Sequence, residues 1–536
     1  MSDEKLIIYQ VFTRLFGNNN NHCINNGSIT ENGCGKMADF TAKALGEIKK
    51  LGATHIWYTG IIEHATQTDY RRYNIRPDHP AIVKGKAGSP YAIKDYYDVD
   101  PDLAKDVPER MREFENLVQR THRSGLKVII DFVPNHVARQ YHSDMQPDGT
   151  SQLGANDDTD YAFSPYNNFY YIPQSELHGQ FDMKGAAAEP YKEFPAKATG
   201  NNRFDAYPNI NDWYETVKLN YGVDYQNGGT CHFNPIPDTW NKMLDILMFW
   251  AEKHIDGFRC DMAEMVPVEF WEWAIPQVKA KYPALLFIAE VYNPKEYGNY
   301  LFRGKFDYLY DKVGLYDTLR AIVCGNESAT AITRAWQSLG GIEKRMLNFL
   351  ENHDEQRIAS DFFASNPRKA IPALIVSACM NVNPMMIYYG IKIIDPQFLF
   401  VTAFFVCAII STFTGTSFGS AGTAGVAIMG IAIALGLPLP IAAGAVLSGA
   451  VFGDKLSPFS DTTILAPIAA GSELYDHIRH MLYTTGAASI LCIIVYTAVG
   501  MTMDVKSMTN PETVKAVLTN MEPVSYTHLR AHETSQ

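Results

Sequence analysis

Four carboxylates each lie at or just after the end of a short apolar run. Asp131 lies in IIDFVPNH, Asp261 ends GFRCD, Glu290 ends LLFIAE and Asp354 follows LNFLENH. A single acid after a strand is most often a helix cap or a solvated loop residue. Four such acids are harder to explain as caps, because the carboxyl ends of parallel barrel strands meet on one face. We therefore expect these side chains to form one site.

Carboxylates grouped in this way predict cleavage of a glycosidic bond. In that chemistry one ionised carboxylate attacks the anomeric carbon, while a second carboxyl group protonates the leaving oxygen. Arg259 stands two residues before Asp261. We expect its positive charge to hold the pKa of the Asp261 carboxyl down, so that this group stays ionised as the nucleophile.

Strand-like and helix-like segments alternate over the first 390 residues and would position these acids. Eight strands are predicted: Leu6–Phe12, Thr54–Tyr58, Leu126–Asp131, Gly257–Asp261, Leu285–Glu290, Lys305–Tyr308, Met346–Leu350 and Met385–Tyr389. Helices are predicted between them, among others at Met37–Leu51, Pro108–Ser124, Thr239–His254 and Val266–Tyr282. The alternation implies parallel pairing, and eight units predict a (β/α)8 TIM barrel. A doubly wound open sheet is the alternative.

A long connection interrupts the pattern after the third strand. Val137–Pro237 is far longer than an ordinary strand-to-helix loop and is rich in Asn, Asp, Gly and Tyr. This composition predicts a small inserted domain, residues 137–237, beside the site. Its aromatic residues either pack that domain or stack on sugar faces. The catalytic barrel would then comprise residues 1–136 and 238–390.

The motifs DFVPNH, GFRCD, FIAE and ENHD, in this order, resemble the four signature regions of the α-amylase family, glycoside hydrolase family 13. The resemblance covers residues 5–390. It implies a retaining enzyme that acts on α-glucosidic bonds of α-glucans or maltooligosaccharides. It also implies Asp261 as the nucleophile, Glu290 as the general acid/base and Asp354 as the transition-state stabiliser, with Asp131 in a structural role.

The same resemblance implies residues that bind the sugar and a cation. Four side chains would contact the sugar at the cleaved bond: Tyr91 in SPYAIKDYYDVDP, His136, Arg259 and His353. Asn135 stands where the family usually has a calcium ligand, so calcium is the cofactor implied. No organic cofactor is implied.

Two features depart from the family pattern. Glu264 and Met265 stand where many members carry Lys-His, which leaves the aglycone-side contacts and hence the substrate length open. The resemblance itself allows either hydrolysis or transfer. After the eighth strand, MMIYYG continues into IKIIDPQFLF, where the family has an acidic loop, a last helix and usually a β-domain. We expect a barrel that lacks this last helix and C-terminal β-domain, with an exposed apolar flank and poor stability.

The composition of the chain changes after the eighth predicted strand. From Pro396 to Gly453 it contains no Asp, Glu, Lys, Arg or His. A soluble surface needs charges, whereas a charge at the centre of a bilayer costs about 3 kcal/mol. We predict an all-α transmembrane segment over residues 391–506, with membrane contact for residues 396–503 and a polar tail at 507–536. Buried helices of a soluble protein are the alternative.

Within this segment GTS and GDKLSPFSDTT resemble motifs of the NhaC-type Na⁺/H⁺ antiporter family, over about residues 387–523. The resemblance implies Na⁺ and H⁺ as ligands. Acids at membrane depth usually mark an ion path, and broken helices expose backbone oxygens to cations. The ion-path candidates are Asp454, Ser457, Asp461 and Thr462, followed by Thr416 and Ser417. Alternatively, Asp454 and Lys455 lie in a capped loop at the membrane surface. Only part of such an antiporter is present, so transport by this chain alone is not expected.

The two resemblances meet at IYYG, residues 387–390, a stretch that suits both families. Three hypotheses follow: an α-glucan hydrolase, an Na⁺/H⁺ antiporter fragment, or an assembly chimera of two genes with no function of its own. The end VSYTHLRAHETSQ, residues 524–536, fits neither family. It resembles translated sequencing-adapter sequence; an ordinary polar tail is the alternative.

Composition and charge limit the classes of partner and the cellular locations that we expect. The net charge of −12, without a basic stripe, argues against a nucleic-acid partner. Eight cysteines form no CxxC pair, which argues against a zinc site or a thioredoxin-like site. A reducing compartment is the simpler interpretation of these scattered cysteines. The N-terminus lacks a signal-peptide apolar region, so the barrel half alone would be cytoplasmic. Arg368, Lys369 and Lys392 precede the apolar segment, and the positive-inside rule predicts a membrane-anchored chain with a cytoplasmic barrel.

Overall fold

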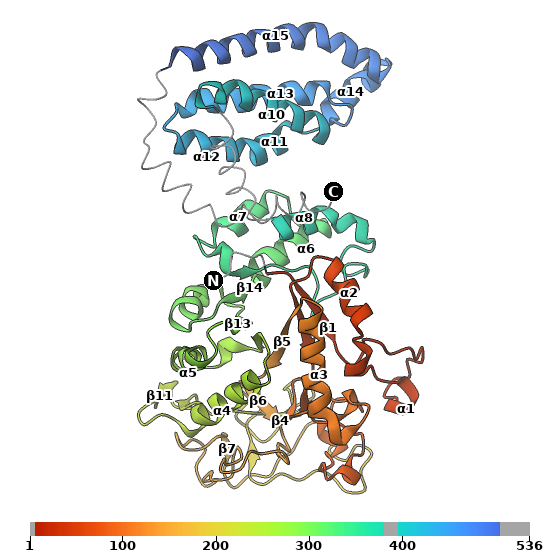
Figure 1. Ribbon diagram of the computed structural model, residues 1–536, viewed down its shortest axis with the longest axis vertical. Coiled ribbons are helices and arrows are strands. Elements are labelled where there is room, and N and C mark those ends of the chain that lie inside the picture. Colours follow the sequence, from red (N-terminus) through yellow and green to blue (C-terminus); the bar gives the residue numbers. More distant parts are fainter. Residues whose placement is uncertain (1–5, 380–394, 504–536) are drawn as a thin grey trace. The chain divides into compact units, whose positions relative to one another are not determined.

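The computed structural model describes residues 6–379 and 395–503 of the chain (Figure 1). The chain forms two compact units. The first, Leu6–Ala378, contains the strands and the helices between them. The second begins at Cys379 and is helical in its described part.

The first unit is built on a curled sheet of seven parallel strands (Figure 1). In sheet order they are β1 (Ile8–Phe12), β2 (His55–Thr59), β5 (Lys127–Phe132), β12 (Gly257–Cys260), β13 (Leu286–Ala289), β14 (Tyr308–Tyr310) and β15 (Met346–Leu347). Their order in space follows their order in the chain. A doubly wound sheet reverses direction at a switch point, whereas a barrel does not. The barrel prediction is therefore confirmed, and the open-sheet alternative is wrong for the described strands.

The strand boundaries differ from prediction at the end of the sheet. β14 begins at Tyr308 and not at Lys305, because Lys305 has a φ of 64°, a left-handed conformation that a strand does not contain. β15 ends at Leu347 and not at Leu350. The predicted eighth strand, Met385–Tyr389, lies outside the described residues.

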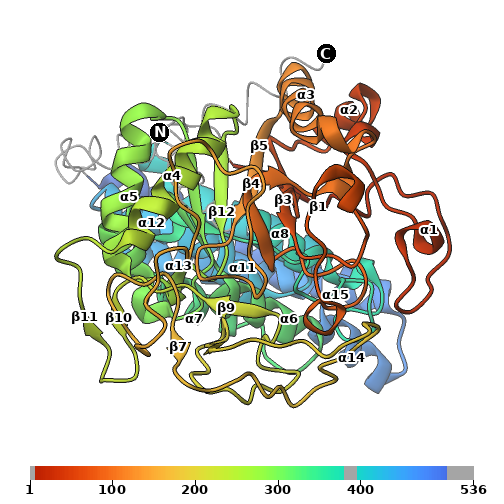
Figure 2. The ribbon, with the colours of Figure 1, turned by 90° about the horizontal axis from the view of Figure 1, so that it is seen from below.

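Helices cover the outer side of the sheet, as Figure 2 shows for α3 (Arg110–Arg123), α4 (Asp238–Glu252) and α5 (Val268–Lys281). With α2 (Ala42–Lys50) they match the four predicted helices to within five residues at each end. Each buries one apolar face against the strands. Trp250 of α4 is fully buried, and its indole nitrogen donates to the backbone oxygen of Tyr96 at 2.7 Å. Burial of one such side chain stabilises the fold by about 2–3 kcal/mol.

Shorter elements complete this unit. A hairpin of β3 (Ile62–His64) and β4 (Ile93–Val99) follows β2, and α1 (Ile29–Asn32) follows β1. The helices α6 (Asp317–Val323) and α7 (Ala331–Gln337) lie between β14 and β15, and α8 (Ile371–Cys379) comes after β15.

The predicted insertion lies between β5 and α4. It begins with β6 (His136–Ala138) and contains only short strands: β7 (Tyr171–Ile172), β8 (Ala196–Lys197), β9 (Thr216–Lys218), β10 (Val223–Asp224) and β11 (Thr230–Cys231). They pair antiparallel as β6–β9, β7–β8 and β10–β11. The register of the first pair sets His136 opposite Lys218, beside the end of β5.

The second unit contains α10 (Leu399–Thr414), α11 (Ser417–Ser420), α12 (Val426–Ala434), α13 (Leu439–Leu456), α14 (Asp461–Ala470) and α15 (Leu474–Thr502). α10 and α13 lie side by side (Figure 1). Gly449 and Gly453 of α13 face the backbone of Phe404 and Ala408, where a Cβ atom would clash. Small residues thus allow close helix packing, as in membrane proteins. Within the part of the chain that the structure describes, three segments are long and apolar enough to span a bilayer: Pro396–Thr414, Leu439–Leu456 and Leu474–Thr502.

Candidate active site and candidate ion site

The sheet brings three of the four predicted carboxylates to one edge. Asp131 lies in β5, while Asp261 and Glu290 directly follow β12 and β13. The amide of Asp261 donates to the Phe132 oxygen at 2.9 Å, and that of Glu290 donates to the Cys260 oxygen at 3.1 Å. These bonds continue the parallel ladder one residue past each strand, so both acids are fixed at the carboxyl ends.

Arg259 holds these three carboxylates together. Its Nη1 donates to Asp261 Oδ1 at 2.7 Å and to Asp131 Oδ1 at 3.3 Å. Its Nη2 lies 2.9 Å from Glu290 Oε2 as an ion pair, without hydrogen-bond geometry. Its Nε donates to the hydroxyl of Tyr310 at 3.0 Å. The arginine is 1 % exposed, so water does not screen these contacts.

Aromatic rings surround the guanidinium. Its central carbon lies 5.1 Å from the Trp57 ring centroid, 5.6 Å from that of Tyr91 and 5.4 Å from that of Tyr310. Each ring face attracts a cation. The Trp57 indole nitrogen also donates to Asp131 Oδ2 at 2.9 Å. Asp131 thus links Trp57 and Arg259, in keeping with a structural role.

The charge balance at Asp261 differs from prediction. Burial raises the pKa of Asp261 well above its usual value; Arg259 opposes this rise, and the charges of Glu290 and Asp131 add to it. The expectation that Arg259 would hold this pKa down is wrong for the net effect. Arg259 does act in that direction, but it is shared among three acids, and the desolvation is larger.

The carboxylate of Glu290 is fixed by two donors. Its Oε2 accepts from the backbone nitrogen of Met262 at 2.8 Å, and its Oε1 accepts from the Tyr292 hydroxyl at 2.5 Å. Met262 has a φ of 43°, a costly left-handed conformation for a residue with a side chain. Met262 directly follows Asp261, and the residue in this conformation is the one whose backbone amide donates to Glu290.

Glu264 has a different role from the residue pair that the family pattern suggests. Its Oε2 accepts from the backbone nitrogens of Tyr292 and Asn293, at 3.1 and 3.0 Å. Glu264 therefore fixes the loop after β13, which carries Tyr292 beside Glu290. The sequence pattern shows the departure at Glu264 but predicts neither this contact nor the contribution of Tyr292.

Asp354 and His353 follow β15 and reach the cluster through Tyr91. His353 Nε2 lies 3.0 Å from Asp354 Oδ2 and forms a short hydrogen bond with the Tyr91 hydroxyl. The rings of Tyr91 and His353 stack at 5.3 Å, and the Tyr91 hydroxyl lies 3.4 Å from Asp131 Oδ1. Burial opposes ionisation of Asp354, but the His353 hydrogen bond and the charges of His353 and Arg259 lower its pKa.

His136 lies on the insertion side of the cluster, against Trp213. Burial lowers the pKa of His136 to about 3, with further lowering by Lys218 and Lys84. The ring centroids of His136 and Trp213 are 5.3 Å apart. Trp213 has a φ of 46°, and Thr216 holds its backbone oxygen through two bonds of 2.9 Å. Trp213 was not among the predicted site residues, and the abundance of aromatic residues in the insertion is the one signal for it in the sequence.

The surroundings of Asn135 do not fit the predicted calcium ion. Its side-chain nitrogen donates to the Gly200 oxygen at 2.8 Å, while its side-chain oxygen accepts from Lys218 Nζ. A calcium ion needs six to eight oxygen ligands, and the one from Asn135 already faces an amine. A divalent cation there would lie against the donor nitrogen of Lys218.

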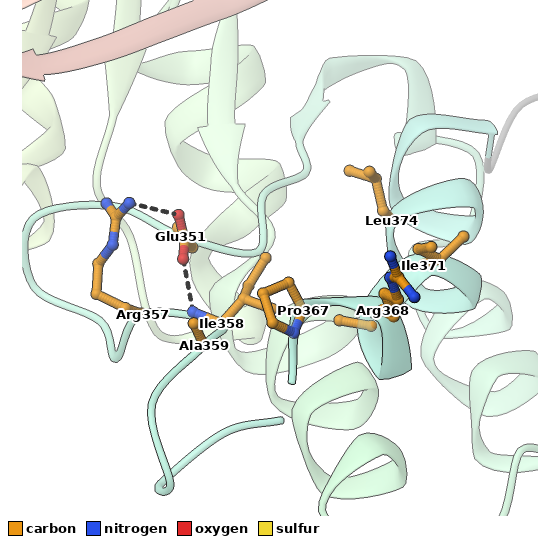
Figure 3. Close-up of a pocket in the computed structure, with 9 residues that line it drawn as sticks. Glu351, Arg357, Ile358, Ala359, Pro367, Arg368, Ile371 and Leu374 are labelled. Atoms are coloured by element: carbon orange, nitrogen blue, oxygen red, sulfur yellow. Dashed lines mark hydrogen bonds and ion pairs between the residues drawn. The ribbon is translucent and has the colours of Figure 1, made fainter. Parts of the chain in front are cut away.

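A pocket of about 440 Å³ lies between the loop after β15 and the start of α8 (Figure 3). Glu351 of the ENHD motif accepts from the Ile358 amide at 2.5 Å and pairs with Arg357 at 3.4 Å. Asp261, Glu290 and Asp354 do not line this pocket. Glu351 shapes the loop and does not belong to the carboxylate cluster.

The second unit places some of the ion-path candidates together. Asp454, near the end of α13, is buried, and Thr462 Oγ1 donates to its Oδ2 at 3.4 Å. Ser457 donates to the Thr412 oxygen of α10 at 2.7 Å. Asp461 is exposed and is the first residue of α14. Thr416 caps α11, whose first residue is Ser417.

Comparisons with known proteins match both parts of the chain. A family model described as the alpha amylase catalytic domain matches residues 10–286, and one described as the Na⁺/H⁺ antiporter family matches residues 390–501 and 449–533. The chain is 47% identical over 174 residues to an uncharacterized Na⁺/H⁺ antiporter of Haemophilus influenzae, covering 31% of this chain and 37% of that one. It is 23% identical to alpha-amylase 2 of Dictyoglomus thermophilum, covering 72% of this chain and 54% of that one.

Among solved structures, an alpha-amylase from Lactobacillus plantarum matches with a TM-score of 0.41 and 24% identity, covering 66% of this chain and 64% of that one. The chain thus spans about half the length of the curated amylase relative and about a third of the antiporter relative. The amylase model alone covers more than half of the chain. The chain belongs to the α-amylase family through its barrel, and from residue 390 it is similar to part of the Na⁺/H⁺ antiporter family.

Proposed function

We propose that the first unit is a retaining glycoside hydrolase that cleaves α-glucosidic bonds in α-glucans or maltooligosaccharides. The observation that carries the proposal is the contact of one buried guanidinium, that of Arg259, with Asp131, Asp261 and Glu290. This places two carboxylates with different partners side by side at the carboxyl ends of neighbouring strands. Double displacement needs such a pair.

In the first step, Asp261 attacks the anomeric carbon and forms a glycosyl ester as the glycosidic bond breaks. The carboxyl group of Glu290 gives its proton to the leaving oxygen. In the second step, Glu290 takes a proton from water, the water oxygen attacks the anomeric carbon, and the ester bond to Asp261 breaks. The Met262 amide and the Tyr292 hydroxyl hold Glu290 in place for both proton transfers.

The remaining predicted residues would orient the sugar ring. Tyr91, stacked on His353 and close to Arg259, offers a ring face against which a sugar can pack. Asp354, with its lowered pKa, stays ionised and would stabilise the positive charge that develops at the anomeric carbon. His136, neutral near pH 7, would act as a hydrogen-bond partner and not as a charge.

The test is hydrolysis of maltooligosaccharides by the full chain in detergent micelles, followed by release of reducing ends. Asp261→Asn keeps the shape of the side chain but removes the nucleophile, so the rate should fall about 10⁴-fold or more. Asp148→Asn, an exposed acid in the same unit, is the matched control. Equal rates for the wild type and Asp261→Asn would contradict the proposal.

We further propose that the three apolar segments anchor the chain in a membrane with the barrel on the cytoplasmic side. Cys23 and Cys231 are exposed on the first unit. A membrane-impermeant maleimide should label them in inside-out vesicles and not in intact cells. Labelling in intact cells would place the barrel outside.

Ion binding at Asp454 is a second candidate function. The buried position of Asp454 and its contact with Thr462 favour an ion-path residue over a surface loop. Sodium-dependent proton movement into vesicles that is lost in Asp454→Asn and Asp461→Asn would support it. The chain spans about a third of the antiporter relatives' length.

A chimera of two unrelated genes remains the third hypothesis. Its test is long-read sequencing of the source DNA across the codons for Tyr388–Asp395. Single molecules that span this junction would establish the fusion. If no molecule spans it, each half is a fragment of its own family.

A further inference from the structure

Lys218 is a buried lysine of the insertion, and packing alone does not explain its position. It is the last residue of β9 and is 2 % exposed. Its Nζ donates to the Asn135 side-chain oxygen and to the Met265 backbone oxygen at 3.2 Å, and it lies 5.4 Å from the Tyr225 ring centroid. A long polar side chain is costly to bury, so it is kept inside only where its nitrogen is used.

The contacts of Lys218 join three parts of the first unit. Asn135 follows β5, which carries Asp131, and Met265 lies in the turn after β12, four residues past Asp261. Lys218 and Tyr225 belong to the insertion between β5 and α4. One amine therefore ties the insertion to the two barrel loops beside the nucleophile.

A bound cation would make the same kind of tie, but the donor set excludes one here. The oxygens that accept hydrogen bonds from Nζ are an amide and a backbone carbonyl, and neither belongs to a carboxylate. Hard cations such as calcium are held chiefly by carboxylates. Within residues 6–379 and 395–503, the one group of acids close enough to share an ion is Glu63, Asp95 and Asp144, and it does not include Asn135.

We infer that Lys218 takes the place of a metal ion in linking the insertion to the barrel. The fold around Asp261 is therefore independent of calcium. Nζ can donate to both oxygens whether it carries two protons or three. The amine belongs to a side chain of the protein, so a chelator cannot remove it. This inference concerns folding and does not depend on the proposed catalytic activity.

The test is thermal unfolding of the full chain in detergent micelles, followed by near-ultraviolet circular dichroism at constant sodium concentration. The wild type should melt at the same temperature in EDTA and in millimolar CaCl₂. Lys218→Met leaves two buried oxygens without a donor and should lower the melting temperature by about 5 °C in both solutions. Lys192→Met, which removes an exposed lysine of the insertion, is the control.

A second variant reverses the chemistry. Lys218→Asp places a carboxylate beside the Asn135 and Met265 oxygens, so calcium should raise its melting temperature and EDTA should reverse the gain. A wild-type melting temperature that falls in EDTA and recovers with calcium would overturn the inference. Unfolding of Lys218→Met at the wild-type temperature would overturn it as well. If Lys218→Met does not fold, the comparison of wild-type melting temperatures in EDTA and in CaCl₂ still tests whether the fold is independent of calcium.

Discussion

Arg259 lies directly opposite Asp131 in the register of β12 and β5, and its Nη1 is 3.3 Å from Asp131 Oδ1. The same nitrogen reaches Asp261 at 2.7 Å. The strand pairing therefore sets the electrostatics of the site, because the register decides which acids share the guanidinium. Arg259 therefore contributes to both the stability and the acidity of this edge of the sheet, beside the effect of burial.

Replacement of Arg259 by methionine should destabilise the barrel strongly. The change removes the cation of a buried cluster and leaves three acids without it. Loss of one partner from a buried ion pair costs about 3–5 kcal/mol. Urea unfolding of the full chain, followed by tryptophan fluorescence, would measure the loss. Arg123→Met, at an exposed position of α3, should change the unfolding free energy by about 0.5 kcal/mol or less.

The pH profile of hydrolysis should report the pKa of Asp261. The nucleophile must be ionised, so kcat/KM falls as the pH drops through this pKa. Burial raises the pKa while Arg259 lowers it. In Arg259→Lys the shorter side chain holds the carboxylates less closely, so the acidic limb should move to higher pH. A limb that stays in place or moves to lower pH would show that Arg259 does not set this acidity.

Trp213 should contribute to substrate binding through its position against His136. Removal of an aromatic platform costs about 1–2 kcal/mol of binding, so Trp213→Ala should raise KM about tenfold with a smaller effect on kcat. Trp213→Phe should recover most of the affinity. The control is Tyr161→Ala, an exposed aromatic residue of the insertion. Unchanged KM in Trp213→Ala would remove this residue from the site.

His136 should make the barrel less stable in acid. Burial, with Lys218 and Lys84, depresses its pKa to about 3 in the folded state, from 6.5 in the unfolded chain; a hydrogen bond with the Tyr91 backbone acts in the opposite direction. Between these values the unfolded state binds more protons, so stability falls as the pH drops from 6.5 to 3. In His136→Gln the unfolding free energy should depend less on pH in this window. A slope equal to that of the wild type would contradict the assignment.

Much of the barrel could be predicted because its strands are short and buried. β5, β12 and β13 read as apolar runs that end in an acid, and their parallel pairing followed from the helices between them. The bounds of β14 could not be predicted, because the left-handed turn at Lys305 has no sequence signal beyond ordinary polarity. The acids Asp131, Asp261 and Glu290 could be predicted for the same reason. The ends of these apolar runs can be located in the sequence, and the strand ends position the site.

The roles of Lys218, Trp213 and Met262 could not be predicted. Each depends on where the insertion returns to the barrel or on a strained backbone angle, and neither leaves a periodic pattern in the sequence. The direction of the net pKa shift of Asp261 could not be predicted either, because desolvation depends on packing and not on the neighbouring residue. A charge two positions away is visible in sequence, whereas burial is not.

The most direct test of the central claim is trapping of the glycosyl ester. The full chain would be incubated with a 5-fluoro-α-glucosyl fluoride, digested and analysed by mass spectrometry. We expect one fluoroglucosyl group on the peptide that contains Asp261, absent in Asp261→Asn and present in Asp148→Asn. Absence of any adduct, together with first release of the β-anomer from maltooligosaccharides, or an adduct on another carboxylate, would contradict it.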